Sequence, residues 1–310
     1  MRRGCFAAAL LLCVLLAAGG ICPAAHAAVI RPVRIAFLDS GISAKHLDAA
    51  QIAPGENLIF PGRDTEDRVG HGTATASLVL GSAELGLAGS CPLAVAVPLV
   101  CYDRYPSGAV ARGDGAVLAQ GIRRAVDVYG CKIINISMGT TEPSRELEQA
   151  VAYAQEQGAL LVAAVGNDGV TAPDRIYYPA AYEGVIAVGA ADGNAAAAFS
   201  QQGYVTVIAQ GVGLRAATNR NAAETASCSG TSYACALVSG LCARLWQEDP
   251  ELTAAGVRER LIALAADVGA SGADASSGFG LVDTSSPYND ARLLKGAGRP
   301  ERGYAPALFA

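Results

Sequence analysis

The sequence predicts an α/β fold: a central, mostly parallel sheet lying between two layers of helices, in a three-layer α/β/α arrangement. From Val33 onward, short apolar runs alternate with longer amphipathic segments, which is typical of parallel strands joined by helices. Runs such as IAFL and KIINI are almost continuously apolar, as strands buried on both faces are. The chain has 310 residues, 52% of them hydrophobic and 16% charged, which is enough to bury a sizeable core.

Six apolar runs are the strand candidates. They are Val33–Leu38, Leu93–Val100, Lys132–Ile136, Leu160–Ala164, Val185–Val188 and Val205–Ile208. Because ligands of such sheets bind beyond the carboxyl ends of the strands, we expect the functional residues there.

Five segments carry apolar residues at helical three- and four-residue spacing. They are Gly72–Leu80, Gly115–Tyr129, Ser144–Gln157, Ser232–Trp246 and Thr253–Ala265. Ser144 and Thr253 are suited to cap helix N-termini, and Gly130 and Gly158 to follow helix C-termini.

The N-terminus is predicted to be a signal peptide, residues 1–27. Arg2 and Arg3 precede the apolar run Phe6–Ala18, and the small residues Ala25 and Ala27 mark a cleavage site. A membrane anchor is the alternative, but the run is short for a bilayer span. Attachment of a lipid at Cys22 is disfavoured, because the bulky Ile21 precedes it.

We therefore expect residues 28–286 to form one domain and residues 287–310, rich in Gly, Pro, Arg and Ala, to form a loosely held tail. The formal net charge of −5 and the lack of a Lys/Arg cluster argue against nucleic acid or an anionic membrane as a partner. After removal of the signal peptide, the expected product is an exported, soluble monomer, secreted or periplasmic.

Six cysteines remain after signal cleavage, an even number that permits disulfides in an exported chain. Cys91 and Cys101 flank a strand that separates them by roughly 30 Å. Cys235 and Cys242 are about 10 Å apart along one helix. Neither pair can form a disulfide. Other pairings and buried free thiols stay open, and no cysteine spacing indicates zinc.

Three residues have the character of a nucleophilic site. Asp39 ends the first strand in LDSGI, His71 lies in GHGT, and Ser232 opens a helix in SGTSYA. A serine hydroxyl needs a general base within reach, and the base needs a third group that fixes its tautomer. The alternative base, His46, lacks the flanking glycines of His71.

Asn167, in AAVGN, follows another predicted strand. Its side-chain amide could donate to a developing oxyanion, with the backbone N–H of Ser232 as the second donor. Each of these residues alone has an ordinary interpretation as a turn or cap residue. Their joint occurrence at strand ends and helix starts, each with a glycine nearby, favours one catalytic site.

In these four motifs and their order, the chain resembles the subtilisin-like serine peptidases, over Val33 to Asp283. The Asp-His-Ser order is that of subtilisin, whereas an esterase of the α/β-hydrolase type places its serine first. The resemblance implies a serine endopeptidase that acts on protein or peptide substrates through an acyl-enzyme. A catalytically silent peptide-binding protein on the same scaffold is the alternative.

The resemblance also implies a substrate-binding edge. Ser137 and Gly139 would form one wall of the pocket for the residue before the scissile bond. Ala164 and Gly166 would form the opposite wall, and Tyr177 would lie near the floor and narrow the pocket. An extended peptide bound in this way takes its affinity from main-chain hydrogen bonds.

The chain departs from the family pattern at several places. After the nucleophile it has Ala236 and Leu237 where the family usually has Pro and His, and Ala74 replaces a frequent second His. Few residues separate the cleavage site from the first strand, so we expect folding without an attached pro-region.

Family members often bind calcium. The one local acidic cluster here is Asp64, Glu66 and Asp67, which we expect to be a solvated loop. The chemistry itself is expected to need no cofactor, and a structural calcium ion stays open.

Overall fold

The computed structural model describes residues 31–285, so the predicted signal peptide and C-terminal tail lie outside the described residues. Its main sheet has eight strands in the order β10-β8-β7-β6-β1-β3-β2, with β9 paired to β8. All pairings are parallel except β8 with β9. The predicted mostly parallel sheet is therefore confirmed.

Each of the six predicted strands is present, with ends shifted by a few residues. They are β1 (Arg34–Asp39), β3 (Val95–Val100), β6 (Ile133–Ile136), β7 (Leu160–Ala164), β8 (Ile186–Asp192) and β10 (Val207–Gln210). Two short strands at the sheet margins, β2 (Glu56–Asn57) and β9 (Ala195–Ala196), have too few residues for a periodic signal.

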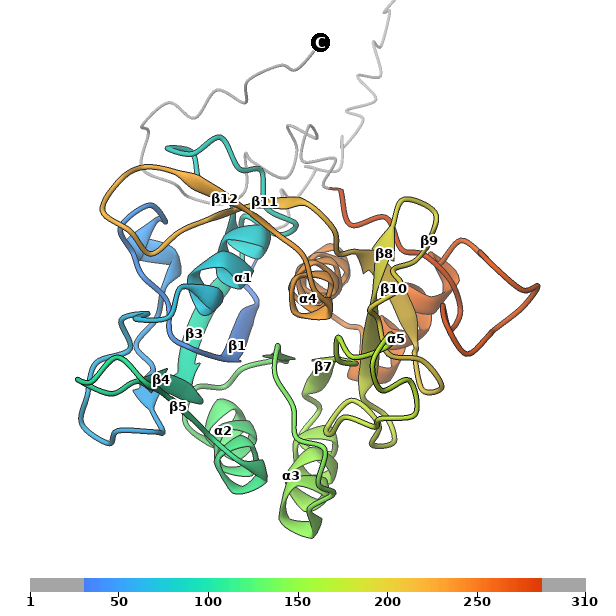
Figure 1. Cartoon of the computed structure of the whole chain (residues 1–310), viewed down its shortest axis with the longest axis horizontal. Coiled ribbons are helices and arrows are strands. Elements are labelled where there is room, and N and C mark those ends of the chain that lie inside the picture. Colours follow the sequence, from blue (N-terminus) through green and yellow to red (C-terminus); the bar gives the residue numbers. More distant parts are fainter. Residues whose placement is uncertain (1–30, 286–310) are drawn as a thin grey trace, which may run out of the picture.

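The five predicted helices are confirmed and cover both faces of the sheet (Figure 1). On one face lie α1 (His71–Leu80), α4 (Thr231–Glu248) and α5 (Ala254–Ala263); on the other lie α2 (Gly115–Asp127) and α3 (Arg145–Glu156). A 3-10 turn, η1 (Ala49–Gln51), follows β1.

Local capping explains where several helices begin and end. Ser144 Oγ accepts a hydrogen bond from the N–H of Leu147 before α3, and Thr253 caps α5 in the same way. Gly130 and Gly158 follow α2 and α3 with φ angles of +57° and +79°, the left-handed conformation that glycine adopts at low cost. These four predictions are confirmed.

Alternate residues of β1 show why the molecule has three layers. Ile35 and Phe37 are fully buried in the cluster that contains α1 and α4. Ala36 and Leu38 point the other way, into the cluster that contains α2 and α3. Because side chains alternate along a strand, an apolar strand of this kind requires helices on both faces.

Strands β1, β6 and β7 are neighbours whose carboxyl ends lie at one edge of the sheet. The chain leaves them at Asp39, Ile136 and Ala164. Residues in the segments that follow are thus brought together, although 136 − 39 = 97 positions separate the first two strand ends and 164 − 136 = 28 the last two.

Two antiparallel hairpins were not predicted, because their strands are only three or four residues long. One pairs β4 (Tyr102–Arg104) with β5 (Val110–Arg112); the other pairs β11 (Leu214–Ala217) with β12 (Thr225–Cys228). The second hairpin leads directly into the start of α4.

The structure of residues 31–285 decides whether their cysteines form disulfides, which the sequence left open. All six cysteines there carry thiols and none forms a disulfide; five are buried, and Cys228 is partly exposed. In the same part of the chain, no helix combines the length and apolar character needed to cross a bilayer.

Candidate active site

Asp39 ends β1 with a fully buried carboxylate. Burying a charge is costly unless donors surround it. Oδ1 accepts hydrogen bonds from His71 Nδ1 (2.8 Å), the N–H of Ser40 (2.7 Å) and the hydroxyl of Tyr102 (3.0 Å). Oδ2 accepts from Thr75 Oγ1 (3.0 Å). The carboxylate is therefore held in one orientation, aimed at His71.

His71 is the first residue of α1, and glycines on both sides determine its position. Gly70 has a φ of +105°. A methyl group on Gly72 would lie 2.1 Å from the carbonyl oxygen of Gly41, so only glycine allows α1 to approach the turn after β1 this closely. The side chain of His71 is 23% exposed, so one side of the imidazole faces solvent.

The charges around His71 stabilise its protonated form, which suits a general base that accepts a proton during the reaction. Burial acts to lower its pKa, but the charge of Asp39 and the hydrogen bond to it outweigh burial, and the pKa of His71 is raised above its ordinary value. Because Nδ1 faces a carboxylate, Nδ1 carries the proton and Nε2 is left as the basic nitrogen.

His46, the alternative base, is occupied elsewhere. It is 7% exposed, with Nε2 2.9 Å from the carbonyl oxygen of Arg220 and Nδ1 3.3 Å from Glu84. Both ring nitrogens therefore have structural partners, which supports the choice of His71.

Ser232 is the second residue of α4 and is 9% exposed. It exchanges hydrogen bonds with Ser137, just beyond β6: Ser232 Oγ donates to the Ser137 carbonyl oxygen (2.9 Å), and Ser137 Oγ donates to the Ser232 carbonyl oxygen (3.1 Å). Asn135 Nδ2 in turn donates to Ser137 Oγ (2.9 Å). In this resting arrangement the hydroxyl proton of Ser232 points at Ser137.

Asn167 is anchored to the start of α4. Its Oδ1 accepts from the N–H of Thr231 (2.9 Å) and from Thr231 Oγ1 (3.0 Å). Since an N–H can only donate, this pairing assigns the oxygen of the amide and leaves Nδ2 on the opposite side. Within the described chain, the N–H of Ser232 has no hydrogen-bond acceptor, so two donors are available at the positive end of α4.

The predicted substrate-binding residues gather at the same sheet edge. Ser137 and Gly139 follow β6, while Ala164 ends β7 and Gly166 follows it. The side chain of Tyr177 lies between the two glycines: a methyl group on Gly166 would come within 2.4 Å of its ring, and one on Gly139 within 3.5 Å.

A cleft of about 290 Å³ opens beside His71, toward the β11–β12 hairpin. The ring of Tyr233 borders it, with its centroid 5.3 Å from that of His71. Asn219, Arg220 and Cys228 also line the cleft. Sequence reasoning missed these residues, because nothing local connects the hairpin with the histidine.

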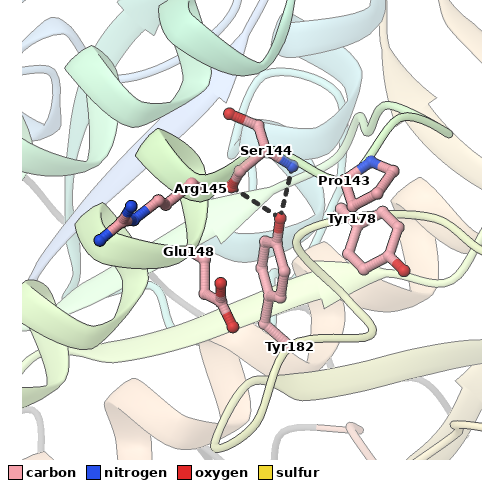
Figure 2. A pocket seen from close by; sticks show the side chains of 6 residues that line it. All are labelled: Pro143, Ser144, Arg145, Glu148, Tyr178 and Tyr182. Carbon is pink, nitrogen blue, oxygen red and sulfur yellow. Dashed lines mark hydrogen bonds between the residues drawn. The ribbon is translucent and has the colours of Figure 1, made fainter.

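A larger open pocket, of about 550 Å³, has none of the predicted catalytic residues in its lining (Figure 2). Its lining consists of Pro143, Ser144, Arg145, Glu148, Tyr178 and Tyr182. Figure 2 shows the Tyr182 hydroxyl against the main chain of Ser144, donating to its carbonyl oxygen and accepting from its N–H (both 2.9 Å). These bonds fix the start of α3, so we assign the pocket a structural role.

The expectation of a solvated acidic loop is wrong for Asp67, which is 2% exposed. Its carboxylate accepts from the N–H groups of Val69, Gly70 and Thr73 and from two hydroxyls, those of Ser40 and Thr73. It thus organises the turn before His71. Burial raises the pKa of Asp67, and the hydrogen bonds oppose that shift.

The sequence signal for this role was an Asp three residues before the Gly70 N-cap, a spacing that suits a side chain bonding to a following turn. Among residues 31–285, no group of three or more His, Cys, Asp or Glu side chains is arranged to hold a metal ion.

The sequence profile of the subtilase family matches residues 31–280. The minor extracellular protease Epr of Bacillus subtilis (strain 168) is 35% identical over 261 residues, which cover 83% of this chain but only 39% of Epr. Subtilisin BL of Lederbergia lenta is 35% identical over 240 residues, covering 76% of this chain and 84% of subtilisin BL.

A solved structure shows the same fold. The S41 psychrophilic protease superposes with a TM-score of 0.72 at 28% sequence identity, over 81% of this chain and 90% of that protease. The likeness in fold thus extends over most of the chain.

Proposed function

The chain belongs to the subtilase family of serine-type endopeptidases, and we propose that Asp39, His71 and Ser232 are its catalytic triad. The observation that carries the proposal is the 2.8 Å hydrogen bond from His71 Nδ1 to the buried carboxylate of Asp39. It leaves Nε2 as a base whose protonated form the carboxylate stabilises.

In the proposed mechanism, the Ser232 hydroxyl turns from the Ser137 carbonyl to His71 Nε2, which takes its proton as Oγ attacks the substrate carbonyl carbon. The imidazolium then gives this proton to the leaving amine, the C–N bond breaks, and an acyl-enzyme remains. His71 next deprotonates a water molecule that attacks the ester carbon. The acid product leaves, and the proton returns to Ser232 Oγ.

We assign the oxyanion to two donors, Asn167 Nδ2 and the N–H of Ser232. Support comes from the anchoring of Asn167 Oδ1 by Thr231, which turns Nδ2 to the other side. Such donors contribute because they are already oriented before charge develops on the substrate oxygen. We propose that the chemistry needs no metal or cofactor, because side chains, the backbone N–H of Ser232 and water supply every group in this mechanism.

We further propose that an extended protein or peptide substrate binds between Ser137–Gly139 and Ala164–Gly166. All groups of the proposed site come from one chain, which is consistent with a monomer. Residues 1–27 are proposed to direct export and then be removed, and the name of the relative Epr describes that protein as extracellular.

The test compares wild type with Ser232→Ala, using a serine-directed fluorophosphonate and digestion of a casein-type substrate. We expect wild type to be labelled and to cleave, and Ser232→Ala to fold but do neither. The matched control is Ser227→Ala, which makes the same change at an exposed serine on β12 and should retain both activities. A folded wild type that resists labelling and cleaves no peptide would instead indicate the silent peptide-binding protein.

A further inference from the structure

We propose that the ring of Tyr177 fills the pocket for the substrate residue before the scissile bond, so that cleavage follows residues with small side chains: Gly, Ala or Ser. The inference rests on the proposed function and adds the class of substrate. It goes beyond the expectation that Tyr177 narrows the pocket floor, because the ring lies between the walls themselves.

The position of the ring is defined by the two glycines. A methyl group added to Gly166 would lie 2.4 Å from Cδ2 and 2.5 Å from Cε2 of Tyr177, so this edge of the ring is in contact with the Gly166 backbone. A methyl group added to Gly139 would lie 3.5 Å from Cδ1, the opposite edge. The ring therefore spans the space that separates the two proposed pocket walls.

Hydrogen bonds at both ends hold Tyr177 in this position. The phenolic hydroxyl donates to Asp168 Oδ2, and the guanidinium of Arg175 binds the same carboxylate oxygen. The hydrogen bond from Tyr177, followed by that from Arg175, lowers the pKa of Asp168, so this acceptor is charged at neutral pH. At the other end, the N–H of Tyr177 donates to the hydroxyl of Tyr204 (2.9 Å).

The flanking backbone is tied to both walls as well. The hydroxyl of Tyr204 donates to the carbonyl oxygen of Val165 (2.7 Å), next to Gly166. Tyr178 and Thr140 exchange two backbone hydrogen bonds (2.8 and 2.9 Å), next to Gly139. Rotating the ring out of the pocket would break its bond to Asp168, while the backbone bonds fix the segment that carries the ring. We therefore expect a bound substrate to accommodate the ring rather than displace it.

The chemical consequence is exclusion by size. An aromatic or long aliphatic side chain entering between the walls would overlap the Tyr177 ring, whereas a hydrogen atom, a methyl group or a hydroxymethyl group requires little depth. Close-packed groups tolerate little overlap, because relieving it needs shifts of side chains or backbone.

The test uses peptide substrates that differ only in the residue before the scissile bond, Ala or Phe. For wild type we expect kcat/KM to favour Ala by at least about 100-fold. Tyr177→Gly should lower this Ala-to-Phe ratio by at least about 100-fold by opening the pocket. Tyr177→Phe is the matched control: it keeps the ring and loses only the bond to Asp168, so the preference for Ala should persist.

Fluorophosphonate labelling of Ser232 separates the possible failures. A labelled wild type that cleaves after Phe as well as after Ala, or a labelled Tyr177→Gly with an unchanged ratio, would overturn the inference and leave the proposed function standing. A wild type that is neither labelled nor active would overturn both. If Tyr177→Gly does not fold, Tyr177→Ala removes the same ring and should show the same fall in the Ala-to-Phe ratio.

Discussion

Tyr102 and His71 donate hydrogen bonds to the same oxygen of the buried Asp39 carboxylate, the phenol at 3.0 Å and Nδ1 at 2.8 Å. Tyr102 comes from the β4–β5 hairpin and is 5% exposed. Burial, with a further contribution from Asp39, raises its pKa well above the ordinary value for tyrosine, so the phenol stays protonated and acts as a donor. We infer that Tyr102 is a positioning residue for the triad.

Tyr102→Phe should move the acidic limb of the kcat/KM pH profile to higher pH, by less than about one unit. With one donor fewer, the charge of Asp39 is less dispersed and stabilises the protonated form of His71 more strongly. The measurement is the pH profile on one peptide substrate.

Tyr153→Phe is the control for this change, because its hydroxyl bonds to Asp127 between surface helices. The limb should stay in place in that variant. A shift of equal size in both variants, or a shift to lower pH in Tyr102→Phe, would contradict the role assigned to Tyr102.

In the wild type, kcat/KM should rise with pH through a midpoint above about 6.5, the ordinary pKa of histidine. His71 must be neutral to accept the proton of Ser232, and its pKa is raised, so a larger share of the enzyme is inactive at a given acidic pH. The rate of fluorophosphonate labelling, measured in parallel, should follow the same curve. A midpoint at or below that of a free histidine would show that the Asp39 charge does not dominate.

Asn167→Ala should reduce kcat by about 10²- to 10³-fold with little change in KM, a magnitude established for the side-chain oxyanion donor of subtilisin. In the wild type, the Asn167 amide stabilises the substrate oxygen only once charge has developed on it. Its loss therefore lowers kcat and changes KM little. Steady-state kinetics on one peptide measure the effect.

Thr231→Val offers a comparison at the same contact. It removes one of the two bonds to Asn167 Oδ1 and keeps the N–H bond, so the loss of kcat should be under about tenfold. Equal losses in the Thr231 and Asn167 variants would mean that the amide has a structural role only.

Asp67→Ala should lower the free energy of unfolding by about 3 kcal/mol or more, because several N–H and hydroxyl groups lose their acceptor in a buried turn. Asp64→Ala, in the same loop, removes an exposed carboxylate paired with Arg68 and should cost less than about 1 kcal/mol. Urea unfolding of both variants measures the difference. Similar costs would refute the claim that Asp67 organises the turn before His71.

The sequence alone determined the alternation of strands and helices and the place of the four site motifs. Each depends on a few consecutive residues: an apolar run such as Val33–Leu38, a cap such as Ser144, or a short motif such as GHGT around His71. The carboxyl ends of neighbouring parallel strands meet at one edge, so Asp39 and Asn167 could be expected together before any coordinates were known.

Only the tertiary structure decided what surrounds those residues. Tyr102 reaches Asp39 from 63 positions away, and Tyr177 lies between Gly139 and Gly166, which come from two different strand ends. Asp67 bonds to Val69, Gly70 and Thr73 nearby in sequence, but its bond to the Ser40 hydroxyl joins positions 27 apart. Such contacts depend on how distant segments pack, and hydrophobic periodicity records only which face of each element is buried. The sequence could therefore indicate the residues of the proposed triad, while the packing determined what holds Asp39 in place and where the Tyr177 ring lies.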